Sequence, residues 1–192
     1  MRNLTLHKFL AMLLMTVSSA TLSVAQNVAK NVAKIGTTEY ATLKAAVYDA
    51  TAGQTVTLIN DVDLTTDDDL EVGKLQNIVL DMNGHSIKGA NADDKNIWVS
   101  GGKLTLKDSK ENSTGKFYAE TPYKEGVYDK PLVRVDNNGE FVMESGHIYS
   151  VSAGNLQFVI GAYTNGKVTI NGGTIESGGY AINGSNDEYQ NT

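Results

Sequence analysis

The chain has 192 residues, of which 41% are hydrophobic and 20% charged, with a formal net charge of −6 and no cysteine. This length and this balance suit one globular domain rather than a disordered acidic tail. The lack of cysteine excludes a disulfide scaffold, a thiolate nucleophile and a Cys-ligated zinc site. The acidic balance argues against a nucleic-acid partner, because phosphate binding needs clustered Lys and Arg.

Residues 1–25 have the layout of a secretory signal peptide. Arg2 and Lys8 begin it, an apolar run follows at 9–17, and small residues before Gln26 form a cleavage site. The run is too short to span about 30 Å of hydrocarbon. We therefore expect a chain that is secreted or held at the cell surface, with no transmembrane segment after cleavage. Cleavage leaves 14 Lys and Arg against 22 Asp and Glu, a net charge of −8.

The first predicted element is a helix over about residues 38–51. Thr37 or Thr38 is placed to cap its start and Gly53 its end. Four apolar residues recur at i, i+3, i+4 and i+7 and line one face: Leu43, Ala46, Val47 and Ala50.

After this helix the apolar period changes to two, which is typical of strands. Asn-Gly pairs, which suit sharp corners, separate the short strand patterns. The patterns are Thr55–Leu58, Ile78–Met82, Lys103–Leu106, Glu140–Met143 and Lys167–Ile170.

These strand patterns belong to a repeat. Residues 132–150 align with residues 159–177 at an offset of 27. The second apolar residue of each strand, taken as an anchor, recurs at steps of 24, 24, 37 and 27: Leu58, Met82, Leu106, Met143 and Ile170. A repeat in the twenties without an internal helix is typical of a solenoid. We predict an all-β chain, a right-handed parallel β-helix with coils over about 54–184 and the helix as N-terminal cap; a sandwich or barrel is the alternative.

Three segments carry a resemblance to a known family: residues 34–47, 53–58 and 80–87. They look like the opening of secreted pectate-lyase-like β-helix proteins of bacteria, especially gut Bacteroidetes and Firmicutes, and residues 168–175 resemble the repeat of these proteins. The resemblance covers about residues 32–184 and implies the same fold and export. It implies little about activity, because that superfamily contains lyases, hydrolases, adhesins and uncharacterised surface proteins.

The end of the chain allows two interpretations. Residues 180–184 have the pattern of the first strand of a further coil, and residues 185–192 are polar. Because a solenoid needs a cap at both ends, either this tail folds over the last coil or the chain is the front of a longer protein. We favour the longer protein, in which the coils could serve as a structural spacer.

The sequence lacks the catalytic patterns of this fold family. The lyases use paired arginines around a proline, whereas Arg134 is the one arginine after residue 25. Of the four blocks of the pectin hydrolases, only adjacent aspartates are found, and solvated loops explain these equally well. We interpret Arg134, His85 and His147 as surface residues of the repeat. No catalytic residue is predicted, and a lyase or glycoside hydrolase on the same fold is the alternative to a non-enzymatic protein.

One acidic cluster is a candidate calcium site, and no other cofactor is predicted. The cluster consists of Asp67, Asp68, Asp69 and Glu71. Calcium accepts such oxygen ligands in flexible geometry. An EF-hand loop begun at Asp61 is excluded, because Thr66 and Val72 replace its glycine at position 6 and its glutamate at position 12.

The longest step of the repeat contains the predicted ligand-binding segment, residues 111–131, which breaks the two-residue period. Insertions in solenoids often loop out from the binding face, and Tyr and Trp suit a sugar ring or a protein partner. The predicted ligand-binding residues are Trp98, Tyr118, Tyr123 and Tyr128. The alternative is that the rings fasten the segment to the coil beneath. We expect an adhesin-like, non-enzymatic surface module that binds a glycan or a partner on a host or bacterial surface.

Overall fold

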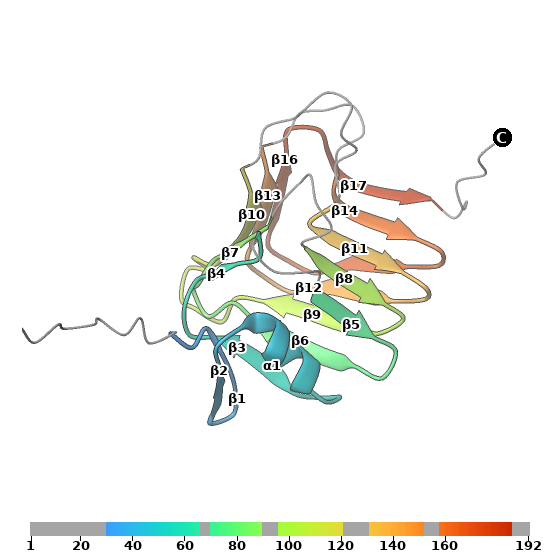
Figure 1. The fold of residues 1–192 in the computed structure, drawn as a ribbon. Helices are drawn as coiled ribbons and strands as arrows, with labels where there is room; N and C mark the ends of the chain where they lie inside the picture. Colours follow the sequence, from blue (N-terminus) through green and yellow to red (C-terminus); the bar gives the residue numbers. More distant parts are fainter. Residues whose placement is uncertain (1–29, 66–69, 90–95, 121–130, 152–157, 186–192) are drawn as a thin grey trace, which may run out of the picture.

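The computed structural model describes residues 30–65, 70–89, 96–120, 131–151 and 158–185. In these residues three sheets of parallel strands run along one stack, and one short helix lies at its N-terminal end (Figure 1). The predicted parallel β-helix with a single N-terminal helix is therefore confirmed. No helix within the described ranges is long and apolar enough to cross a membrane. The predicted signal peptide, residues 1–25, lies outside these ranges.

Each coil of the stack contributes one strand to each sheet. Sheet A contains β3 (Thr55–Leu58), β6 (Asn77–Asp81), β9 (Lys103–Lys107), β12 (Glu140–Met143) and β15 (Lys167–Ile170). Sheet B contains β4 (Val62–Asp63), β7 (Ile87–Lys88), β10 (Lys116–Ala119), β13 (His147–Ser150) and β16 (Thr174–Ser177). Sheet C contains β5 (Leu70–Gly73), β8 (Ile97–Ser100), β11 (Val133–Asp136), β14 (Phe158–Tyr163) and β17 (Tyr180–Ser185).

The core is a column of stacked apolar side chains. In β9, Leu104 and Leu106 are buried, whereas Lys103, Thr105 and Lys107 point outward and are half-buried. Pairing in register places each inward side chain on its counterpart in the next coil, as in the row Ile78, Leu104, Phe141 and Val168. Full burial of such a side chain contributes about 1.5–3 kcal/mol. The two-residue pattern therefore becomes one continuous core.

The strand register confirms the repeat and corrects one of its anchors. The predicted offset is found in the pairs Val133 with Ile160, Phe141 with Val168, and Ile148 with Ile175. Leu106, however, pairs with Leu80 rather than with Met82, so the step between these two coils is longer than predicted. The reason is that β6 ends at Asp81, and Met82 already belongs to the corner that follows, although it is also buried.

The N-terminal cap has more parts than the predicted helix. The helix α1 (Leu43–Asp49) begins at residue 43 rather than at 38, and Ala50 is its C-cap in place of Gly53. Residues 38–40 instead form β2 (Thr38–Tyr40), which pairs antiparallel with β1 (Ala33–Ile35). Thr42 sets the start of α1, because its hydroxyl accepts a hydrogen bond from the backbone N–H of Ala45 at 3.1 Å.

The cap covers the first coil of the stack. Strand β1 pairs antiparallel with the outer edge of β3, and α1 buries Leu43, Ala46 and Val47. Gln76, at the start of the second coil, donates a hydrogen bond to the carbonyl of Val47 at 2.6 Å and so ties the helix to the stack. The hairpin and the helix thus protect a strand edge and one end of the core from water.

The last described coil is complete but less covered. Strand β17 is its third strand and pairs with β14, so residues 180–184 do not begin a further coil as predicted. Only residues 178 and 179 separate β17 from β16, so the connection from sheet B to sheet C is shorter here than in each earlier coil. Three of its large apolar side chains are exposed: Ile170, Tyr180 and Ile182, by 39%, 59% and 45%.

Candidate functional site

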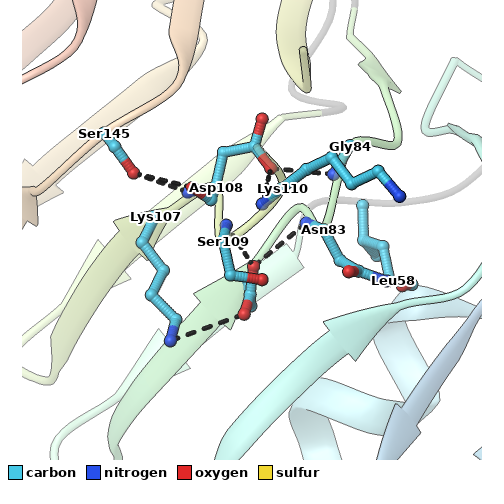
Figure 2. Close-up of polar contacts among 9 residues, drawn as sticks. Leu58, Asn83, Gly84, Lys107, Asp108, Ser109, Lys110 and Ser145 are labelled. Carbon is cyan, nitrogen blue, oxygen red and sulfur yellow. Dashed lines mark hydrogen bonds and ion pairs between the residues drawn. The ribbon is translucent and has the colours of Figure 1, made fainter. Parts of the chain in front are cut away.

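Two buried carboxylates, Asp81 at the end of β6 and Asp108 directly after β9, lie where the chain leaves sheet A for sheet B. Figure 2 labels Asp108 and several residues that these carboxylates contact. Asp81 is 5% exposed, and its Oδ1 accepts hydrogen bonds from the backbone N–H groups of Asn83 and Ser109, each at 3.0 Å. Its Oδ2 lies 3.4 Å from Nζ of Lys107. Asp81 therefore holds its own corner and the corner of the next coil.

Asp108, in the next coil, holds the same two corners from the other side. Its Oδ1 accepts from the backbone N–H groups of Gly84 at 2.8 Å and Lys110 at 3.1 Å, and its Oδ2 accepts from that of Gly115 at 2.5 Å. Its own N–H donates to Oγ of Ser145 at 2.8 Å. Carboxylates that accept from several fixed donors at a buried corner hold backbone groups that would otherwise lack partners. We interpret both aspartates as corner residues rather than as catalytic groups.

The outward face of sheet C carries a different kind of cluster. Trp98 on β8 pairs in register with Arg134 on β11. The guanidinium carbon of Arg134 lies 5.5 Å from the ring centroid of Trp98 and 5.5 Å from that of Tyr163 on β14. The guanidinium therefore lies near two aromatic rings, each contributing about 0.5–1 kcal/mol at an exposed site.

A buried carboxylate orients this cluster. Asp136 is 3% exposed, and its Oδ1 accepts a hydrogen bond from the indole Nε1–H of Trp98 at 2.7 Å. Its Oδ2 accepts from Nε–H of Arg134 at 2.9 Å. One carboxylate thus fixes the side chains of two neighbouring coils.

A glycine makes room for the Tyr163 ring and for one further ring, Phe158. Gly161 pairs in register with Arg134, and a Cβ atom at residue 161 would lie 2.8 Å from the Tyr163 ring and 2.9 Å from the Phe158 ring. These two rings lie 6.3 Å apart, centroid to centroid, at 57°. We call Trp98, Arg134, Phe158 and Tyr163 the sheet C patch.

The outward face of sheet B carries a tyrosine pair. Tyr118 and Tyr149 stack with ring centroids 5.3 Å apart and planes 11° apart. The hydroxyl of Tyr149 donates to Oε1 of Glu120 at 3.2 Å. Burial first, and then this carboxylate, raise the pKa of Tyr149. Because the two rings face each other and the Tyr149 hydroxyl is bonded to Glu120, the ring faces between them are closed to a ligand.

The tyrosine pair has a histidine neighbour on its own strand β13 and a carboxylate neighbour in the next coil. The ring of His147 lies 5.0 Å from that of Tyr149, tilted by 34°. Nε2 of His147 lies 3.4 Å from Oε2 of Glu176 on β16. Glu120 and Glu176 therefore approach the tyrosine pair and its histidine from different coils.

The predicted ligand-binding residues are not gathered in one row. Trp98 lies in sheet C and Tyr118 in sheet B, both as half-buried outward side chains. Tyr123 and Tyr128 lie outside the described residues. Phe158 and Tyr163 are not among the predicted binding residues, and Arg134 is predicted only as a surface residue. A signal was available, since the offset of 27 carries Arg134 onto Gly161 and Asp136 onto Tyr163.

The predicted calcium cluster is described only in part. Asp67, Asp68 and Asp69 lie outside the described residues. Glu71 lies on β5, exposed, and pairs in register with Trp98. Within the described ranges, no three His, Asp or Glu side chains come together in a way that could hold a metal ion.

Comparison of the chain with models of protein families, with curated proteins and with solved structures finds no match.

Proposed function

We propose that the chain is an exported surface module that acts by binding a partner, without catalysis. The sheet C patch is the observation that supports this most. Trp, Tyr and Arg dominate the energies of binding interfaces, and the patch joins all three. Trp98 and Arg134 are held in place by the buried Asp136, so these two side chains have little conformational entropy to lose when a partner binds.

Export and kinship are part of the same proposal. The signal-peptide pattern of residues 1–25 supports a secreted or surface-held protein. The resemblance of residues 34–47 and 80–87 to secreted pectate-lyase-like proteins supports kinship with that group, and the β-solenoid is compatible with it. The partner would then be a glycan or a protein on a host or bacterial surface.

A carbohydrate-active enzyme is the second candidate function, and sheet B favours it. Glycosidases place two carboxyl groups about 5–10 Å apart across the bond that they cleave. The buried aspartates are engaged by backbone and side-chain donors, whereas Glu120 and Glu176 flank Tyr149 on an open face. These two glutamates are the pair that we would assign to catalysis.

One experiment separates the two functions. Residues 26–192 are applied to immobilised polysaccharides and surface proteins, and new reducing ends or unsaturated uronates are measured in parallel. We expect binding without turnover, and binding at least about tenfold weaker in Arg134→Gln, which removes the charge and the fork of donors of the patch. Lys167→Gln is the matched control, because it removes one exposed positive charge from β15 in sheet A; this variant should bind normally.

Two other results would change the assignment. Turnover that Glu120→Gln and Glu176→Gln both abolish would replace the binding module by the enzyme. Binding that survives Arg134→Gln but is lost on addition of EDTA would move the site to the proposed calcium cluster, Asp67, Asp68, Asp69 and Glu71.

A further inference from the structure

We propose that the sheet C patch docks a protein partner that presents one carboxylate beside an apolar side chain, and that Arg134 receives this carboxylate. The inference rests on the proposed binding function and names the chemistry of its partner.

The Arg134 side chain is held in place on one side of its guanidinium. Its Nε is bonded to Asp136, and its guanidinium lies near the rings of Trp98 and Tyr163. Among the described residues no acceptor meets its terminal nitrogens, and the side chain is 45% exposed. A guanidinium held in this way keeps a planar pair of donors, which fits a carboxylate with two parallel hydrogen bonds.

The charge around the patch limits which ligands it can attract. Arg134 is the one cation on the strands of sheet C, as far as the structure describes them, and Glu71 lies in the same outward row. The whole chain carries a net charge of −6. Asp136 already pairs with Nε of Arg134, so a polyanion would be repelled by these acidic surroundings, whereas a single carboxylate can still bond to the terminal N–H groups of Arg134. The charge pattern therefore favours an isolated acidic group.

The position of Arg134 against the aromatic rings favours a protein partner over a sugar. A sugar binds aromatic side chains through their ring faces, and Arg134 lies against Trp98 on one side and Tyr163 on the other. The rings of Trp98 and Tyr163 lie beside the guanidinium, and the Phe158 ring lies next to that of Tyr163, so apolar surface adjoins the charge. A charged centre with aromatic neighbours is the composition of a protein-binding hot spot. We therefore favour an acidic residue of a protein next to an apolar one.

The single tryptophan makes the test specific. Trp98 is the one Trp of the chain, so its fluorescence and its indole N–H resonance report on the patch alone. The probes are acetylated tripeptide amides with Asp or Glu between two Phe or two Leu residues, each paired with its Asn or Gln counterpart. We expect the acidic peptides to shift the indole signal saturably and to bind at least about tenfold more tightly than their amides.

Variants assign the effect to Arg134. Arg134→Gln should remove the preference for acidic peptides, and Arg134→Lys should weaken binding while keeping the charge. Lys167→Gln should behave as the unmodified chain does. Unchanged circular dichroism in Arg134→Lys shows that the fold is intact. If Arg134→Gln fails to fold, the comparison of acidic with amide peptides on the unmodified chain still decides.

Three outcomes would overturn the inference. These are equal affinity for acidic and amide peptides, no indole shift with any peptide, and a larger shift with glucuronate than with the peptides. If immobilised surfaces still bind through the patch in these cases, the proposed function stands and only its partner chemistry is wrong. Turnover of a polysaccharide would contradict the proposed function itself.

Discussion

The phenol of Tyr149 shows how burial and one neighbour act on a single group. Burial is the larger cause of its raised pKa, and the hydrogen bond and charge of Glu120 add to it. A pKa that is higher in the folded than in the unfolded state has a definite linkage to stability. The stabilisation is fully present below the unfolded-state pKa of about 10 and is lost as pH rises through the folded-state value.

Glu120→Gln should therefore lower the pKa of Tyr149 without returning it to the ordinary value, because burial remains. The measurement is a pH titration of tyrosine ring carbon resonances by NMR. Glu111→Gln, an exposed position in the same segment, is the control and should leave the titration unchanged. An unchanged Tyr149 titration in Glu120→Gln would show that the carboxylate does not act on the phenol.

At the scale of elements, the turn from sheet C to sheet A depends on glycine. A Cβ atom on Gly139 would lie 2.4 Å from the carbonyl oxygen of Val99 in the coil below. Gly102 and Gly166 occupy the same place in their coils, with distances of 2.2 and 2.3 Å to carbonyl oxygens. Coils that pack this closely have no room for a side chain at the turn.

Gly139→Ala should destabilise the fold by about 1–3 kcal/mol, the usual cost of an overpacked position. Gly73→Ala is the matched control, because a Cβ atom there meets nothing within 4 Å. Urea unfolding of both variants measures the difference. Equal unfolding free energies of the two variants would show that neighbouring coils move apart at this turn without a loss of stability.

The start of α1 shows what a sequence pattern can hide. The apolar spacing of Leu43, Ala46 and Val47 predicts the helix correctly, and all three are buried. The same pattern could not reveal that residues 38–40 pair with β1, because β1 is held in place by its other edge, which pairs with β3 after the helix. Thr38 and Tyr40 also favour strands over helices, in agreement with this pairing.

At the scale of the whole molecule, stability varies along the stack. Each coil contacts only its neighbours, so a coil covered on both sides gains more than one at an end. Ile148 and Ile175 are partners in register, yet Ile148 is fully buried and Ile175 only partly. The same residue type in the same row is therefore less well buried at the end of the stack than inside it.

Ile148→Ala should cost about 2–5 kcal/mol of unfolding free energy, the usual range for a buried isoleucine, and Ile175→Ala clearly less. Urea unfolding compares the two variants, and hydrogen exchange of the unmodified chain should show faster exchange in β15–β17 than in β9–β11. If Ile175→Ala costs as much as Ile148→Ala, the last coil is covered as well as the inner ones.

The local pattern of this chain determined the class of fold. The two-residue period and the repeat that aligns residues 132–150 with 159–177 predicted the parallel coils, because strands that stack in register must repeat their inward side chains. The sequence also predicted that Arg134 lies on the surface of the repeat. These features depend on neighbouring residues, so they can be read without coordinates.

Only the tertiary structure decided which outward side chains meet. Trp98, Arg134 and Tyr163 come from three coils, and the spacing between them changes with the length of each connection. Asp136 brings Trp98 and Arg134 together although they lie on strands of different coils, far apart in the sequence. The patch depends on the register of coils of unequal length, which the hydrophobic period of one strand does not contain.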